Sequence, residues 1–127
     1  GLFTNGEVPM VLSYTTSPAY HILAEETDRY KAASFDEGHY MQIEVAGITT
    51  KGADNPLSKQ FMEFMVSSDF QSIIPQTNWM LPVADTGDDL DPVFVNAIPE
   101  KALLFAPETV AKQRKQWVDE WLSVMSR

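Results

Sequence analysis

The sequence has no cysteine in its 127 residues, which excludes a disulfide framework, a thiolate metal site and a cysteine nucleophile. It also has no apolar run close to the ~20 residues that a membrane-spanning helix needs. No positively charged segment followed by an apolar one opens the chain, as a secretory leader would. A mature exported protein and a cytosolic protein both fit these absences, so they leave the compartment open.

Basic residues are also scarce: 9 lysines and arginines stand against 18 aspartates and glutamates, a formal net charge of -9 at pH 7. This balance excludes the clustered Lys and Arg of a nucleic-acid surface, so we expect no nucleic-acid partner. The acidity favours a cationic ligand by long-range attraction, which salt screens beyond ~10 Å. Acidity that only keeps the protein soluble explains the same charge.

Motifs of catalysis and metal binding are absent as well. The chain has no Gly-x-Ser-x-Gly elbow, no phosphate-binding loop, no paired catalytic carboxylates and no Cys/His set. His21 and His39 have no companions at metal-ligand spacing. We therefore expect a protein that is not an enzyme and that holds no metal.

The patterns that are present alternate between strand-like and helix-like, which predicts an α/β fold. Residues 10–12 form the short apolar run of a covered strand. Ser17 is expected to cap the next helix and Pro18 to occupy its first position, with the helix ending near Glu26. In open α/β sheets, ligands bind just past the carboxyl end of a strand, where the amides of a helix start remain free. The turn before this helix is therefore a candidate binding site.

Hydrophobic periodicity predicts further elements. Residues 39–46 alternate between two faces, as in a strand. Asn55 opens a helix in which apolar residues recur at helical spacing. Ser67 or Ser68 is expected to cap a short helical piece that stops before Pro75.

The last helix is the clearest predicted element. Pro107 lies near its start, and Glu108 complements the positive end of the helix. Trp117 and Trp121 stand one turn apart on one side, and their plain interpretation is core packing. The whole stripe comprises Val110, Arg114, Trp117, Val118, Trp121 and Met125.

A set of short segments spread along the chain is more specific than these patterns. It comprises residues 1–7, the Ser-Tyr-Thr-Thr-Ser-Pro-Ala-Tyr turn at 13–20, Glu-Gly-His-Tyr at 37–40, residues 64–67, Ile-Pro at 74–75, Asn-Trp-Met at 78–80, and residues 113, 114 and 117. This set resembles the periplasmic thiamine-binding proteins of bacterial ABC importers. Members of that family are well over twice this length, so the resemblance implies the C-terminal portion of such a protein.

The resemblance implies an incomplete part of a two-lobed periplasmic-binding-protein fold of type II. Residues 1–46 would belong to the second lobe, with the strand, the ligand turn and a crossing strand. Residues 47–127 would form a helical part that packs on the first lobe. Because much of that lobe is absent from the chain, we expect the tryptophan stripe to be left partly exposed or buried in an intermolecular contact, self-association included.

The resemblance also implies a role in transport. A protein of this kind captures thiamine, and its phosphate esters, in the periplasm by closing its two lobes and delivers it to the membrane permease. Thiamine or thiamine phosphate is then the transported ligand, and no cofactor is expected. The implied partners are thiamine, the permease and the N-terminal portion of the same protein.

The chemistry of thiamine indicates which residues bind it. Its thiazolium ring is a permanent cation, which needs π-faces or carboxylates to offset its burial. Trp79 lies between Pro75 and Pro82 and is expected on a loop, a common place for binding residues. A purely structural role, with Ser17 as a helix cap and its neighbours as turn formers, is the alternative. By resemblance, the expected ligand-binding residues are Tyr14, Thr15, Thr16, Ser17, Pro18, Tyr20 and Trp79.

A binding protein of the same fold for another solute, such as ferric iron or a phosphorylated compound, is the second hypothesis. Ferric sites of this kind use two adjacent tyrosines with oxygen donors, whereas Tyr14 and Tyr20 are six positions apart. The spacing disfavours iron and leaves other cations and phosphorylated solutes open.

Overall fold

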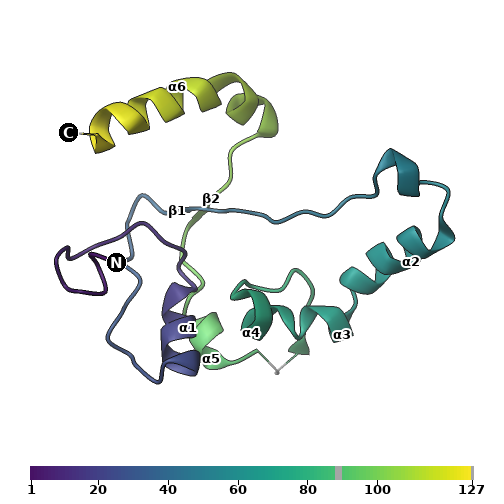
Figure 1. The fold of residues 1–127 in the computed structure, drawn as a ribbon, viewed down its shortest axis with the longest axis horizontal. Coiled ribbons are helices and arrows are strands. Elements are labelled where there is room, and N and C mark those ends of the chain that lie inside the picture. Colours follow the sequence, from purple (N-terminus) through teal and green to yellow (C-terminus); the bar gives the residue numbers. More distant parts are fainter. Residues whose placement is uncertain (88–89, 127) are drawn as a thin grey trace.

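The computed structural model describes residues 1–87 and 90–126 and is rich in helices, with one small parallel sheet. Figure 1 shows the order of the elements along the chain. They are α1 (Ser17–Ala24), β1 (His39–Tyr40), the 3-10 helix η1 (Thr50–Gly52), α2 (Pro56–Met65), α3 (Ser68–Gln71), α4 (Ile74–Asn78), α5 (Pro92–Val95), β2 (Ala102–Leu103) and α6 (Pro107–Met125).

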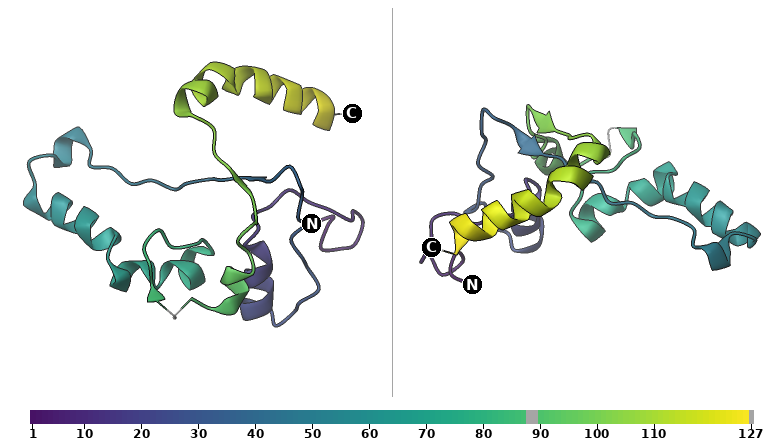
Figure 2. Two further views of the ribbon diagram at one scale, coloured as in Figure 1. Left: turned by 180° about the vertical axis from the view of Figure 1, so that it is seen from behind. Right: turned by 90° about the horizontal axis from the view of Figure 1, so that it is seen from above.

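The elements form an open frame and not closed layers. α1 packs on α5, α2 on α3, and α3 on α4. Figures 1 and 2 show α6 on the opposite side of the β1–β2 pair from these helices, at the end of an extended connection. A second extended stretch, residues 41–49, runs from β1 toward η1 and α2. Within the described residues, no helix combines the length and the apolarity that crossing a membrane requires.

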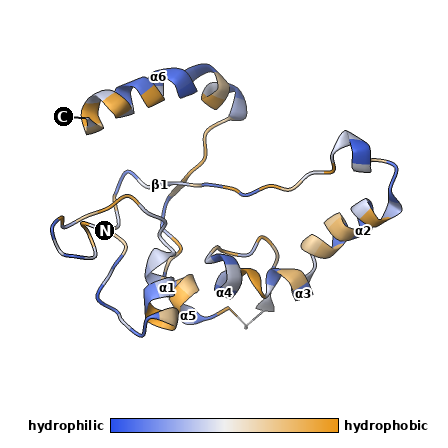
Figure 3. Cartoon of the chain, viewed as in Figure 1, coloured by the Kyte–Doolittle hydropathy of each residue, from blue (hydrophilic) through white to orange (hydrophobic). Residues whose placement is uncertain are grey.

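Very little of the chain is buried. Ala19 and Phe94 are the buried apolar residues among those described, and the chain exposes 10297 Å² of surface. A compact protein of 14.3 kDa exposes about 6,800 Å², so this chain exposes about half as much again. Apolar residues lie on the exposed helices α2 and α6 (Figure 3). The fold is thus incomplete on its own, as the sequence predicted.

The starts of the helices test the predicted caps. The side chain of Asn55 accepts a hydrogen bond from the Leu57 N–H at 3.0 Å, and the predicted cap of α2 is confirmed. Ser67 caps α3 in the same way. The helical piece capped by Ser67 ends at Gln71, so the prediction that it stops before Pro75 is confirmed. A separate helix, α4, was not predicted; it carries Pro75 in its first turn, where the lack of an N–H removes no helix bond.

The predicted cap of α1, Ser17, is wrong by one residue. The helix begins at Ser17, and Thr16 is the N-cap residue but its side chain makes no capping bond. The Ser17 hydroxyl is bonded instead to the Ser13 hydroxyl, at 2.6 Å, across the turn. Pro18 lies in the first turn as expected, and the helix ends at Ala24, close to the predicted end.

The predicted strands are mostly absent. Residues 10–12 have no regular structure and are exposed, so the prediction of a buried strand there is wrong. Of residues 39–46, only His39 and Tyr40 form a strand. A strand needs a neighbour for its backbone hydrogen bonds, and the described part of the chain offers only Ala102–Leu103.

The predicted exposure of the tryptophan stripe on α6 is confirmed. Trp117 is 36% exposed and Trp121 48% exposed. Phe105, just before the helix, lies with its ring 5.6 Å from that of Trp117. An open, largely apolar groove of about 350 Å³, called the α6 groove below, is lined by Leu12 and by four residues of the stripe: Arg114, Trp117, Val118 and Trp121.

The β1–β2 pair depends on a close approach at Gly38. The His39 N–H donates to the Lys101 carbonyl at 3.0 Å, and the Met41 N–H donates to the Leu103 carbonyl at 2.8 Å. Gly38 has a φ of +100°, and a Cβ placed there would lie 2.9 Å from the Lys101 carbonyl oxygen. Neither the conformation nor the space suits a side chain.

We predict that Gly38→Ala lowers the free energy of unfolding by about 1–3 kcal/mol, since it combines backbone strain with a clash at β2. Urea unfolding followed by circular dichroism measures this change. Gly47→Ala is the matched control, because a Cβ at Gly47 meets no atom within 4 Å. Equal stability of the two variants would contradict the prediction.

Candidate functional site

The turn at residues 14–18 is compact and bonded to itself. The Ser17 N–H donates to the Tyr14 carbonyl and the Ala19 N–H to the Thr16 carbonyl, each at 3.0 Å. Thr16 is buried, while Thr15 and Pro18 are half-buried. Two amides at the start of α1 are therefore used inside the turn and are not free for an anion, contrary to the expectation from the sequence.

The structure brings Tyr20 of α1 next to Trp79 at the end of α4. Their ring centroids lie 5.1 Å apart with an interplanar angle of 86°, an edge-to-face arrangement. Phe94 of α5 lies on Trp79 with its ring nearly parallel, at 6.3 Å and 21°. We call these three rings the aromatic corner. It joins three helices that are distant in sequence, and two of its members were predicted to bind the ligand.

Tyr14 does not belong to the aromatic corner. It is 56% exposed, and none of the ring pairs within residues 1–87 and 90–126 includes it. It contributes its backbone carbonyl to the turn. The structure thus places Tyr20 and Trp79 together and leaves the Tyr14 ring open to solvent.

Trp79 has an unusual backbone conformation. It is the C-cap residue of α4, with φ 56° and ψ 36°, in the left-handed region that glycine usually occupies at helix ends. Its N–H donates to the Pro75 carbonyl at 3.1 Å. A non-glycine residue in this region costs on the order of 1 kcal/mol, so packing around the indole must hold it there.

Gln71 fixes the segment that carries Trp79. This side chain is buried, its amide nitrogen donates to the Met65 carbonyl at 2.7 Å, and its oxygen accepts from the Val83 N–H at 2.8 Å. The two bonds join the end of α2 to the stretch that follows α4. Sequence analysis missed Gln71, because no pattern distinguishes it from a solvent-exposed glutamine in a short helix.

A carboxylate also reaches this region from a distant segment. The amide of Asn78 donates to Glu44 Oε2 at 3.0 Å, a bond between residues 34 positions apart. Asn78 is the residue directly before Trp79, and Glu44 lies in the extended stretch 41–49. Sequence analysis placed Glu44 on one face of a strand without assigning it a role.

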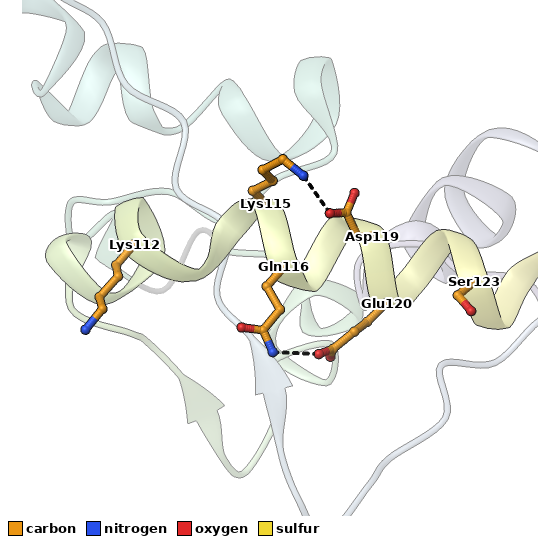
Figure 4. Close-up of a pocket in the computed structure, with 6 residues that line it drawn as sticks. All are labelled: Lys112, Lys115, Gln116, Asp119, Glu120 and Ser123. Atoms are coloured by element: carbon orange, nitrogen blue, oxygen red, sulfur yellow. Dashed lines mark hydrogen bonds and ion pairs between the residues drawn. The ribbon is translucent and has the colours of Figure 1, made fainter.

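Two hollows among the described residues lie on α6. Figure 4 shows one of about 560 Å³ on the polar face of α6, where Lys115 and Asp119 form an ion pair at 2.8 Å. All of its lining residues belong to this one helix, so it has no second wall. Neither this hollow nor the α6 groove includes a predicted site residue, and in residues 1–87 and 90–126 no group of three metal-ligating side chains gathers.

Comparison with known proteins confirms the resemblance to the C-terminal portion of periplasmic thiamine-binding proteins. The chain is 57% identical over 129 residues to the thiamine-binding periplasmic protein of Brucella abortus biovar 1 (strain 9-941). It is 51% identical to the protein of that name from Salmonella typhimurium (strain LT2) and 50% identical to that from Escherichia coli (strain K12). All of the chain is aligned, and it spans 38% of the length of these relatives.

A solved structure agrees with the sequence comparison. A chain described as a periplasmic thiamin binding protein superposes with a TM-score of 0.84 at 49% identity, over all of this chain and 40% of that one. No protein-family model matches the chain. The described arrangement, including its open frame, is therefore similar to part of a larger periplasmic binding protein.

We predict that Gln71→Ala lowers the free energy of unfolding by about 1–3 kcal/mol, because it leaves two backbone groups without partners. Hydrogen exchange at the Val83 amide should become faster, since this amide loses its acceptor. Gln76→Ala is the matched control, because Gln76 is exposed on α4, and it should stay within about 0.5 kcal/mol. Unchanged exchange at Val83 would contradict the role of Gln71.

Proposed function

We propose that the chain is part of a periplasmic solute-binding protein that captures thiamine, and its phosphate esters, and delivers it to the permease of an ABC importer. The observation that carries this proposal is the pairing of Tyr20 with Trp79 within a chain that is similar over its whole length to thiamine-binding periplasmic proteins. Because the chain spans 38% of those relatives, the function belongs to a longer protein.

The aromatic corner suits the chemistry of the vitamin. A thiazolium ring keeps its positive charge when it is desolvated, and an aromatic face offsets that charge at about 0.5–2 kcal/mol without burying a second ion. The hydroxyls of Thr15, Thr16 and Ser17 lie on the turn that leads into Tyr20 and are suited to the polar parts of the ligand. Tyr14 and Pro18 complete the proposed contact set.

The rest of the longer protein is proposed to cover the open frame. Exposed apolar residues lie on the helices, such as Leu57 of α2 and Trp121 of α6, and on the extended segments 10–12 and 41–48. The similarity to part of a larger solved structure supports this view, because the chain is similar to that part while lacking its surroundings. Residues 1–46 would belong to one lobe, and residues 47–127 would include the helices that pack on the other.

Capture is proposed to proceed by closure of two lobes in a type II arrangement, with no covalent chemistry. The similar proteins are named as binding proteins and not as enzymes, which supports this class. The ligand in the names of these proteins also favours thiamine over ferric iron or another solute. Thiamine or its phosphate is then cargo, and no cofactor takes part.

We predict that the longer protein binds thiamine and that Trp79→Leu weakens binding at least about fivefold, since leucine keeps the apolar bulk but lacks the π-face. Tryptophan fluorescence and calorimetric titrations with thiamine measure both effects. The chain alone should bind weakly or not at all, because the surface that closes over the ligand is absent.

Val83→Ala is the control for this titration. Val83 is exposed and lies in the segment that follows Trp79, outside the proposed contact set. Failure of the longer protein to bind thiamine overturns the proposed function. Sub-micromolar binding by the chain alone would overturn the proposed dependence on a second lobe.

We also predict that the chain alone associates with itself or binds an apolar dye, whereas the longer protein does neither. The α6 groove is exposed in the chain and would be covered in the longer protein. Size-exclusion chromatography with light scattering measures the association. Trp121→Gln should reduce it, while Lys112→Gln on the polar face should not; a clean monomer without dye binding would contradict the prediction.

A further inference from the structure

The extended stretch 41–49 brings one charged group to the aromatic corner. Its start is fixed by the Met41 N–H bond to Leu103 and by the near-parallel rings of Tyr40 and Phe105, 5.8 Å apart. Farther along, the bond from Asn78 to Glu44 Oε2 ties the stretch to the residue before Trp79. Glu44 is therefore held at a defined place although it is exposed.

Glu44 takes part in none of the ion pairs found within residues 1–87 and 90–126. The four ion pairs among the described residues are His21–Glu25, Lys31–Asp28, Lys59–Glu63 and Lys115–Asp119. The Asn78 bond engages Oε2, and no described hydrogen bond uses Oε1. The Glu44 carboxylate thus lies on Asn78, the residue that precedes Trp79 in the chain, with Oε1 outside this bond. An exposed charge acts over about 8–10 Å at physiological salt.

We propose that Glu44 is a specificity-determining residue, whose carboxylate favours a cationic ligand at the aromatic corner over an uncharged one of the same shape. This inference rests on the proposed function, because it concerns the same site. The rings of Tyr20 and Trp79 attract both ligands by stacking, whereas the carboxylate acts on the charge alone. The two contributions are therefore separable by experiment.

Glu44→Gln is the decisive variant. The carbonyl of glutamine accepts the Asn78 bond, so the variant removes the charge and keeps the tether. The probes are thiamine and its uncharged analogue, in which carbon replaces the thiazolium nitrogen. In the longer protein, the variant should weaken thiamine binding about fivefold and change binding of the analogue less than twofold.

Salt provides a second readout that a purely structural role would not change. In the longer protein with Glu44 unchanged (the parent), thiamine binding should weaken as sodium chloride rises from 50 to 500 mM, because added salt screens the carboxylate. This salt dependence should be smaller in the Glu44→Gln variant. Glu100→Gln removes the same charge from an exposed position outside the site and is the matched control. It should behave as the parent with both ligands.

The outcomes separate the two proposals. Suppose that the parent binds thiamine and that Glu44→Gln weakens the binding of thiamine and of the uncharged analogue by the same factor, or leaves both affinities unchanged. The role of Glu44 is then overturned and the proposed function stands. If Glu100→Gln reproduces the effect of Glu44→Gln, general acidity explains it and the inference fails. If the parent binds neither probe, the proposed function fails, and the role of Glu44 fails with it.

Discussion

The candidate site depends on the burial of Phe94. It is the large side chain with 0% exposure among the described residues, and it lies on a four-residue helix. That helix is fixed at its start by Asp91, whose side chain accepts a hydrogen bond from the Val93 N–H at 2.9 Å. Because α5 packs on α1 while Phe94 stacks on Trp79, this one ring sets the spacing between the two elements that carry Tyr20 and Trp79. Removing it would separate the aromatic corner even if both partners stayed folded.

The sequence predicted those parts of the fold that are determined locally. The caps at Asn55 and Ser67, and the last helix, follow from side chains that bond to backbone groups within a few residues. The strands were overestimated because alternation describes two faces but does not supply the neighbour that completes a ladder. The short helix α4 was missed for a related reason: a proline can follow the end of one helix and also occupy the first turn of the next, and local sequence does not decide between these roles.

The candidate site shows the same contrast between local features, which the sequence predicts, and features that depend on distant partners. Tyr20 and Trp79 were selected by resemblance and by chemistry, and the structure brings them together. Phe94, Gln71 and Glu44 were missed, because each acts through a partner that is distant along the chain or invisible to periodicity. Whether the full set of seven residues contacts thiamine stays a prediction. Tyr14 shows the difference, since it is selected by the same motif but is 56% exposed and takes part in none of the ring pairs of the described residues.

The pairing of β1 with β2 has a consequence for how the chain folds. His39 is in register with Ala102, and the described helices η1, α2, α3, α4 and α5 lie between the two short strands of this parallel ladder. Closing a loop of that length is slow compared with forming any one of the helices, and the ladder returns few hydrogen bonds for it. We therefore expect the bond from His39 to Lys101 to form late in folding.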